Sequence, residues 1–168
     1  MGTMAAQAAE AHDGGHRIRE DAEMIVADLS SATSPRLAAI ATTATVKTAA
    51  SALSTLDLGM LVVCNEGGPV VGVVSKSDLV RHMARDGAAL AGIAAVMTRD
   101  VVTCSLRDDL QVAWTRMVDR GVQNLPVLND EARPVGVLDI RDALRALLEQ
   151  EGQEERQLIN YVAGIGYR

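Results

Sequence analysis

Aromatic residues are almost absent from this 168-residue sequence, which contains Trp114, Tyr161 and Tyr167 and no phenylalanine. Because 48% of the residues are hydrophobic, a core has to be built from Ala, Val, Leu, Ile and Met in small, closely packed elements. Few aromatic rings are present for nucleic-acid bases to stack on, and a formal net charge of -6 does not attract a phosphate backbone. We therefore expect no nucleic-acid partner.

Cysteine and long apolar runs are also scarce. Cys64 and Cys104 lie in the apolar runs LVVC and VVTC, where a thiol behaves as a small hydrophobic group, and two cysteines form no disulfide framework. No stretch approaches the ~18 consecutive apolar residues of a membrane span, and the N-terminus lacks the basic and apolar regions of a secretory signal. These absences predict a soluble cytoplasmic protein with no membrane partner.

Motifs of the common catalytic sites are missing as well. The sequence contains no GK[ST] phosphate loop, no G-x-S-x-G elbow, no H-E-x-x-H and no C-x-x-C. His12 and His16 are close in sequence, but Gly14 and Gly15 lie between them and no cysteine or carboxylate constellation completes a zinc site. We therefore predict no enzyme, no metal site and no required cofactor.

The strongest positive signal is an internal repeat. When the chain is shifted against itself by 64 positions, GVVSKSD at residues 72–78 falls on GVLDIRD at residues 136–142, and no insertion interrupts the match. Identical pairs include Ala49 and Ala113, Leu61 and Leu125, Asn65 and Asn129, and Arg81 and Arg145. A register held over this length indicates a tandem duplication.

Each copy follows the same order of predicted elements. An apolar helical stripe is followed by two short β-branched runs around a polar turn, which read as buried strands, and then by a second helix. In the first copy we predict strands at 37–41, 60–64 and 70–74 and helices at 46–56 and 77–84. In the second copy we predict strands at 101–104, 125–128 and 135–138 and helices at 110–118 and 141–148. The fold class is therefore α/β (α+β), with tandem β-α-β-β-α repeats.

The other segments flank or join the repeats. Residues 1–35 are expected to hold a flexible start (1–17) and a short helix from Ile18 to Leu29 that Ser34-Pro35 ends. The first repeat then spans 36–84, a connector 85–95, the second repeat 96–148, and an acidic tail 149–168 whose short helix stops at Gly164. Pro126 cannot donate a ladder hydrogen bond, so we expect it at a strand start or a sheet edge.

The repeats resemble the CBS domain pair, the cystathionine β-synthase-type regulatory module, over residues 36–148. The resemblance rests on two registered copies, the first of which runs from its last strand into G-h-h-S-x-x-D at a helix start. VMTRDVVTCSLRDDL (96–110) is similar to the segment that leads into a repeat of that family, and QNLPVLNDEARPVGVLDIRD (123–142) to its central hairpin. The resemblance implies a pseudo-two-fold pair of repeats with flanking helices.

The resemblance also implies a ligand. In that family the cleft between the copies can bind adenine nucleotides or related adenosyl compounds, which suggests AMP, ADP, ATP or S-adenosylmethionine as a regulatory ligand. The motif aspartate is implied to hold the ribose hydroxyls, the motif serine to contact phosphate, and the lead-in segment to line the adenine side. The expected ligand-binding residues are Gly72, Ser75, Ser77, Asp78, Val101, Val102, Thr103 and Asp142.

The chemistry of these residues fits a ligand site and also a simpler role. A helix N-terminus attracts anions, Gly72 permits close backbone approach, and an ionised aspartate offers two acceptors to paired hydroxyls. Cations nearby are Lys76, Arg81, Arg141 and Arg145. Ser75-x-x-Asp78 is equally a capping box and Asp139 equally a good N-cap, so both motifs could serve only to start helices.

The two copies differ in a way that predicts asymmetry. Asp139 stands where the first copy has Ser75, and a carboxylate about 4 Å from a phosphate charge costs up to ~4 kcal/mol at an effective dielectric near 20. Arg141, whose counterpart is the neutral Ser77, offsets part of this repulsion. We expect the first motif to bind a phosphorylated adenosine ligand and the second to be empty, weak or selective for an uncharged group.

Two functions remain open from the sequence. The first is a nucleotide sensor, in which a ligand shifts the arrangement of the two copies and so alters an unidentified partner protein. The second is a ligand-independent scaffold that dimerises and docks an enzyme or transporter. The resemblance implies a homodimer, for which the face of Leu110, Trp114 and Met117 is the candidate contact. Trp114, within this apolar stripe, is expected either in the core or at the interface of the pair.

Overall fold

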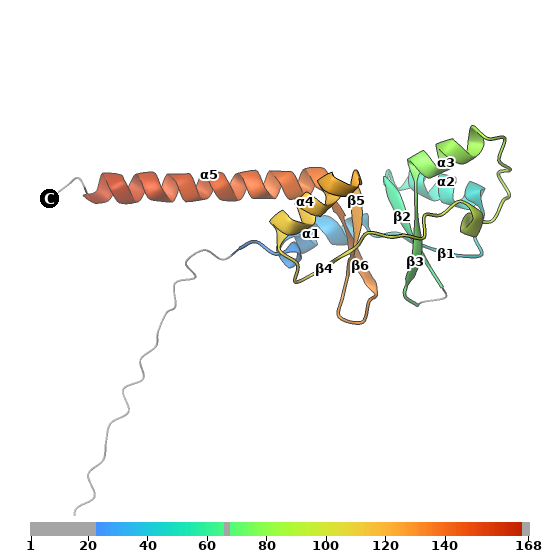
Figure 1. Cartoon of the computed structure of the whole chain (residues 1–168), viewed down its shortest axis with the longest axis horizontal. Helices are drawn as coiled ribbons and strands as arrows, with labels where there is room; N and C mark the ends of the chain where they lie inside the picture. Colours follow the sequence, from blue (N-terminus) through green and yellow to red (C-terminus); the bar gives the residue numbers. More distant parts are fainter. Residues whose placement is uncertain (1–22, 66–67, 166–168) are drawn as a thin grey trace, which may run out of the picture.

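The computed structural model of the chain describes residues 23–65 and 68–165, in which two three-stranded sheets lie side by side (Figure 1). The first sheet contains β1 (Ala39–Ala41), β2 (Met60–Cys64) and β3 (Val70–Ser75), and the second contains β4 (Cys104–Ser105), β5 (Asn124–Leu128) and β6 (Pro134–Asp139). In each sheet the first pair is parallel and the second antiparallel. The predicted tandem β-α-β-β-α architecture is confirmed.

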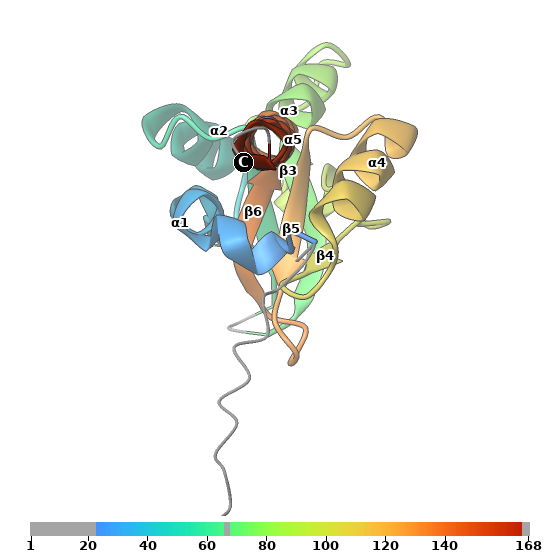
Figure 2. The same cartoon turned by 90° about the vertical axis from the view of Figure 1, so that its left-hand side faces the viewer.

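Each repeat contains two longer helices, and short helical turns lie in the segments that lead into the repeats. The longer helices are α2 (Val46–Thr55), α3 (Lys76–Met83), α4 (Leu110–Arg120) and α5 (Ile140–Ile165), and the short turns are η1 (Val26–Leu29), α1 (Ser30–Thr33), η2 (Ser34–Arg36) and η3 (Ile93–Ala95). The bounds of α4 follow from its caps: Asp109 Oδ1 accepts the N–H of Val112 at 2.8 Å, and Gly121 ends the helix with φ 62°. In Figure 2, α1 and α4 flank the second sheet on either side.

Alternation along β2 explains why this strand is apolar at every position. Leu61 and Val63 belong to the first core, between the sheet and its helices. Met60, Val62 and Cys64 point the other way, into a separate cluster that includes Val137 of β6. Both faces of the strand are therefore buried, one against helices and one against the other sheet.

Two segments cross from one repeat to the other. The first crossover segment, Val26–Arg36, lies against β6, and its Val26 and Leu29 are part of the second core. The second crossover segment, Ile93–Thr98, lies against β3, and its Ile93 and Met97 are part of the first core. Each core is thus completed by residues from the segment that leads into the opposite repeat.

Equivalent glycines make room for these crossings. A Cβ added to Gly136 of β6 would lie 2.8 Å from Thr33 Oγ1 and 3.1 Å from the backbone carbonyl carbon of Thr33. Gly72 of β3 has the same relationship to the second crossover segment. The close approach permitted by the glycine of the GVVSKSD motif is therefore an approach between repeats.

Within the described residues, the expected N-terminal helix is found only in its last four residues, Val26–Leu29, which form a 3-10 turn. Residues 1–22, which contain the expected flexible stretch and the start of that helix, lie outside the described residues. Met24 and Ile25 are not helical, and helical backbone begins at Val26. It continues past Ser34-Pro35 to Arg36, because Pro35 stands in the first turn of η2, where its missing N–H breaks no helical hydrogen bond.

The C-terminal helices also differ from the prediction. The helix expected at 141–148 and the short tail helix form one helix, α5, which Gly164 does not stop and which extends away from the sheets (Figure 1). Residues 149–156 read EQEGQEER and are rich in strong helix formers. Gln150 also donates to Glu154, one turn further on, at 3.0 Å. These residues carry the helix across Gly152.

Pro126 lies in the middle strand of the second sheet and not at a strand start or edge. The two residues of β4 pair only with Val127 and Leu128, so the ladder on that side begins after the proline. The strand expected at 101–104 is correspondingly shorter, and Val101–Thr103 belong to no strand. Among residues 23–65 and 68–165, no helix is long and apolar enough to cross a membrane.

Candidate functional site

The first motif forms a closed capping box at the start of α3. Ser75 donates its backbone N–H and its hydroxyl to Asp78 Oδ2, at 2.8 and 2.7 Å. The Asp78 N–H donates in return to Ser75 Oγ at 3.2 Å. The side chain of Asp78 is 12% exposed. The helix-capping role that the sequence left open is therefore present, and a ligand would have to share these two side chains with it.

Other expected residues of the first motif are placed differently. Ser77 is exposed on the first turn of α3, whereas Gly72 is buried under Met97. Arg81 Nη1 donates to Asp78 Oδ1 at 3.1 Å, and Lys76 Nζ pairs with Asp57 at 3.5 Å. Both cations expected near this motif are thus already paired with carboxylates.

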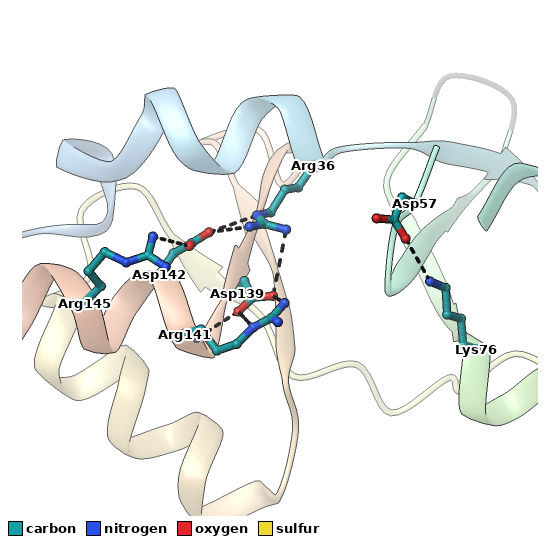
Figure 3. Close-up of polar contacts among 7 residues, drawn as sticks. All are labelled: Arg36, Asp57, Lys76, Asp139, Arg141, Asp142 and Arg145. Carbon is teal, nitrogen blue, oxygen red and sulfur yellow. Dashed lines mark hydrogen bonds and ion pairs between the residues drawn. The ribbon is translucent and has the colours of Figure 1, made fainter. Parts of the chain in front are cut away.

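The second motif is an ionic network of two acids and three arginines at the start of α5 (Figure 3). Arg141 donates from Nε and Nη2 to the two oxygens of Asp139, at 3.0 and 2.8 Å, and its backbone N–H adds a bond of 2.8 Å. Arg145 Nη1 donates to Asp142 Oδ1 at 3.3 Å. Arg36 donates to Asp142 Oδ2 from Nε at 2.9 Å and from Nη2 at 2.8 Å.

Arg36 is the residue of this site that sequence reasoning missed. It stands at the end of the first crossover segment, 106 residues from Asp142 in the chain, and its Nη1 lies 3.9 Å from Asp139 Oδ2. In Figure 3, Asp142 lies between Arg145 on one side and Arg36 on the other. The sequence held one signal of this difference between the repeats: the repeat register aligns Arg36 with Asp100, a residue of opposite charge.

The arginines determine the electrostatics of Asp139. Its pKa lies below the usual value because of the side-chain hydrogen bonds from Arg141, to which the Arg141 backbone N–H and the charges of Arg141 and Arg36 add, against the opposing effect of burial. Asp139 in turn raises the pKa of Arg141. The Asp139 carboxylate is therefore ionised at neutral pH, with guanidinium groups offsetting the charge that a phosphate would meet.

The expected adenine-side residues lie with the second repeat. Val102 packs against the second core and lines a hollow of about 520 Å³ over α4. The carbonyl oxygen of Thr103 accepts a hydrogen bond from Arg116 Nη1 at 2.8 Å. The eight expected residues thus form two groups: Gly72, Ser75, Ser77 and Asp78 on the first repeat, and Val101, Val102, Thr103 and Asp142 on the second.

The expected dimer face is not a free surface. Leu110 and Met117 are fully buried in the second core, and Trp114 packs against it. The apolar side chains that α4 exposes are Val112 and Val118. As for metals, no cluster of His, Cys, Asp or Glu suited to an ion occurs within the described part of the chain, and His12 and His16 lie outside it.

Comparison with known proteins gives the same architecture. The family model for the CBS domain matches twice, over residues 26–85 and 93–149, each match beginning at the first residue of a crossover segment. A homoserine O-acetyltransferase from Methanococcoides burtonii is 32% identical over 112 residues, which are 67% of this chain and 22% of that enzyme. The chain therefore spans about a fifth of the length of that relative.

Solved structures share the fold. The CBS domain pair of protein MJ0100, in complex with 5'-methylthioadenosine and S-adenosyl-L-methionine, matches with a TM-score of 0.66 and 22% identity, covering 74% of this chain and 99% of that one. The cytosolic domain of the Mg²⁺ channel MgtE, in complex with ATP, matches with a TM-score of 0.59 and 25% identity, covering 67% of this chain and 45% of that one.

Proposed function

Because the chain belongs to the CBS-domain family, we propose that it is a regulatory module that binds an adenosine-containing ligand at its first motif and catalyses no reaction itself. The ligand class is AMP, ADP, ATP or S-adenosylmethionine. Support for this class comes from the two similar structures, one crystallised with adenosyl compounds and one with ATP.

The choice of the first motif rests on where in the chain the hydrogen-bond donors to each aspartate come from. Asp78 is held by Ser75 and Arg81, which lie within three residues of it. A ligand that replaces these contacts disturbs one helical turn. Asp142 is held by Arg36 from the opposite repeat, so a ligand there has to break a contact between repeats. Ribose hydroxyls can therefore bind at the first motif with a smaller disturbance of the fold than at the second.

Thermal unfolding with each candidate ligand tests this function. Ligand at ~100 times its dissociation constant adds ~2.7 kcal/mol, which raises the midpoint by several degrees for a domain of this size. We expect one of AMP, ADP, ATP or S-adenosylmethionine to raise the midpoint of the wild type and of Asp142→Ala, and to leave that of Asp78→Ala unchanged.

The comparison uses the ligand-induced shift within each variant, because Asp78→Ala also loses the capping box and starts from a lower midpoint. A shift of the same size in Asp78→Ala would place the ligand elsewhere. No shift with any compound would remove the sensor and leave the scaffold.

The scaffold is the second candidate, and the protruding part of α5 favours it. Leu148, Leu158 and Ile159 are exposed on this helix, which extends away from the sheets (Figure 1). An apolar stripe of this kind suits a second copy of the chain or an unidentified partner. A homodimer through α5 predicts a dimeric sedimentation coefficient for the wild type and a monomeric one for Leu148→Glu.

A further inference from the structure

The acceptor atoms of Asp142 are almost fully occupied. A carboxylate has about four acceptor positions, two on each oxygen. Arg36 fills two positions on Oδ2 with its Nε–H and Nη2–H, and Arg145 takes one on Oδ1. The side chain is only 12% exposed. Asp78 also accepts three hydrogen bonds, from Ser75 and Arg81, and is equally exposed. Paired ribose hydroxyls need two acceptors, so a donor has to leave either aspartate, and at Asp142 that donor is the two-pronged guanidinium of Arg36.

The competition between Arg36 and a ribose favours the arginine. A hydrogen bond from a guanidinium to a carboxylate is roughly twice as strong as one between neutral partners. Arg36 supplies two of them from one planar group and has no binding entropy to lose, because it is part of the same chain. Neutral hydroxyls therefore do not displace it at ordinary ligand concentrations.

The arginine replaces a donor that the second motif lacks. In the first motif, Asp78 Oδ2 accepts the hydroxyl and the backbone N–H of Ser75. An ionised aspartate at the matching position, Asp139, has no side-chain proton to donate. The two features are thus linked: the second motif has Asp139 in place of the serine hydroxyl that donates in the first motif, and Arg36 donates to Asp142 instead.

The opposite crossing shows no such arrangement. The repeat register places Asp100 where the first crossover segment has Arg36. Asp100 is exposed and pairs with Arg120 of α4 at 3.3 Å. The first motif therefore receives no arginine from the position equivalent to Arg36.

From these contacts we infer that Arg36 is an internal plug that closes the second motif to adenosine compounds and so confines binding to the first motif. The inference rests on the proposed function, because it takes the motif aspartate as the acceptor of ribose hydroxyls. Arg36 does not contact the ligand in this proposal; it acts by occupying the acceptor positions of Asp142. Its removal opens a second site in the same chain.

Isothermal titration of the full chain with adenosine tests the plug by counting sites. Adenosine carries the ribose hydroxyls and no phosphate, so the charge of Asp139 does not oppose it. We expect one molecule per chain in the wild type and two in Arg36→Ala, with the second site at least about tenfold tighter than any second site of the wild type. Arg145→Ala is the matched control, because Arg145 contacts the other oxygen of the same carboxylate, and it keeps one site.

Each result separates the plug from the proposed function. One site in both wild type and Arg36→Ala, two in the wild type, or a gain in Arg145→Ala overturns the plug and leaves the first site standing. No site in the wild type and one in Arg36→Ala supports the plug and shows that the first site requires more of its ligand than adenosine. No site in either overturns the plug, and the thermal shifts with AMP, ADP, ATP and S-adenosylmethionine then decide the first site separately. Arg36→Gln, which keeps the aliphatic stem, decides the matter if circular dichroism shows that Arg36→Ala is unfolded.

Discussion

The sulfur of Met97 lies directly against the backbone of Gly72: a Cβ added to Gly72 would sit 2.7 Å from Met97 Sδ and 3.0 Å from the carbonyl oxygen of Thr98. Thr98 also exchanges two backbone hydrogen bonds with Val73, of 3.0 and 2.8 Å. The second crossover segment therefore cannot move away from β3 without losing these bonds. The glycine is required by packing between the repeats, whatever the motif binds.

Gly72→Ala is expected to destabilise the protein by about 1–3 kcal/mol, the usual range for overpacking a filled interior. Gly92→Ala is the control, because a Cβ at Gly92 meets nothing within 4 Å and its φ of -67° suits alanine. It should change the stability by less than about 1 kcal/mol. Urea unfolding measures both, and similar values would show that the Met97 contact yields easily.

Ser75→Ala should lower the free energy of unfolding by about 1 kcal/mol, because it removes the side-chain cap of α3. Ser77→Ala, two residues away on the exposed first turn of the same helix, should change it by less than about 0.5 kcal/mol. Chemical unfolding of the ligand-free variants gives both numbers. Equal effects would mean that the capping box contributes nothing measurable.

The lowered pKa of Asp139 predicts how stability depends on pH. An aspartate in the unfolded chain titrates at pH ~3.9, and the pKa of Asp139 in the folded protein is lower. Its stabilising contribution is therefore fully present above the unfolded pKa and is lost as the pH falls through the folded pKa. Asp139→Asn should be less stable than the wild type at neutral pH, by a gap that closes on acidification.

Urea unfolding at a series of pH values from about 7 to about 2 follows this gap. Asp130→Asn is the control, because Asp130 is 79% exposed and an exposed ion pair contributes little. A gap between wild type and Asp139→Asn that stays constant over this range would contradict the pKa assignment.

Burial raises the pKa of both thiols, and that of Cys104 to about 12 with a further contribution from the charge of Asp108. Cys64 lines a hollow of about 340 Å³ between the two repeats. Because the thiolate is the reactive form, a thiol reagent at pH ~8 should label Cys64 at least about tenfold faster than Cys104. The variants Cys104→Ser and Cys64→Ser isolate the two rates. Denaturant should make the rates equal, and equal rates in the folded protein would refute the difference.

Local signals in the sequence were sufficient for most of the elements. The strands predicted at 60–64 and 70–74 are found as Met60–Cys64 and Val70–Ser75, because short β-branched runs between turn formers leave little freedom in where a strand lies. The helix predicted from its apolar stripe is found as α4. The spacing of its apolar residues showed that one face of this helix is buried. Nothing in that spacing showed that Val26 and Leu29 belong to the core on which the face packs.

Contacts between distant residues could not be predicted in this way. The ion pair of Arg36 with Asp142 depends on the crossing of the first segment over β6, which no local pattern encodes. The sequence showed that the second motif differs by one carboxylate, but not that an arginine from the other repeat compensates for it. The same limitation applies to Gly72, whose close contact with Met97 of the second crossover segment arises from the tertiary packing.

The crossing of Val26–Arg36 over β6 constrains how the chain can fold while it is being synthesised. The residues that close the first core, Ile93 and Met97, leave the ribosome soon after β3, whereas the partner of Arg36 follows 106 residues later. Val26 and Leu29 therefore remain exposed in the growing chain until β6 has emerged. During that interval they can bind chaperones or neighbouring nascent chains. The core of the first repeat can thus be completed before the second repeat is synthesised, yet Val26 and Leu29, among the earliest described residues, are among the last to be buried.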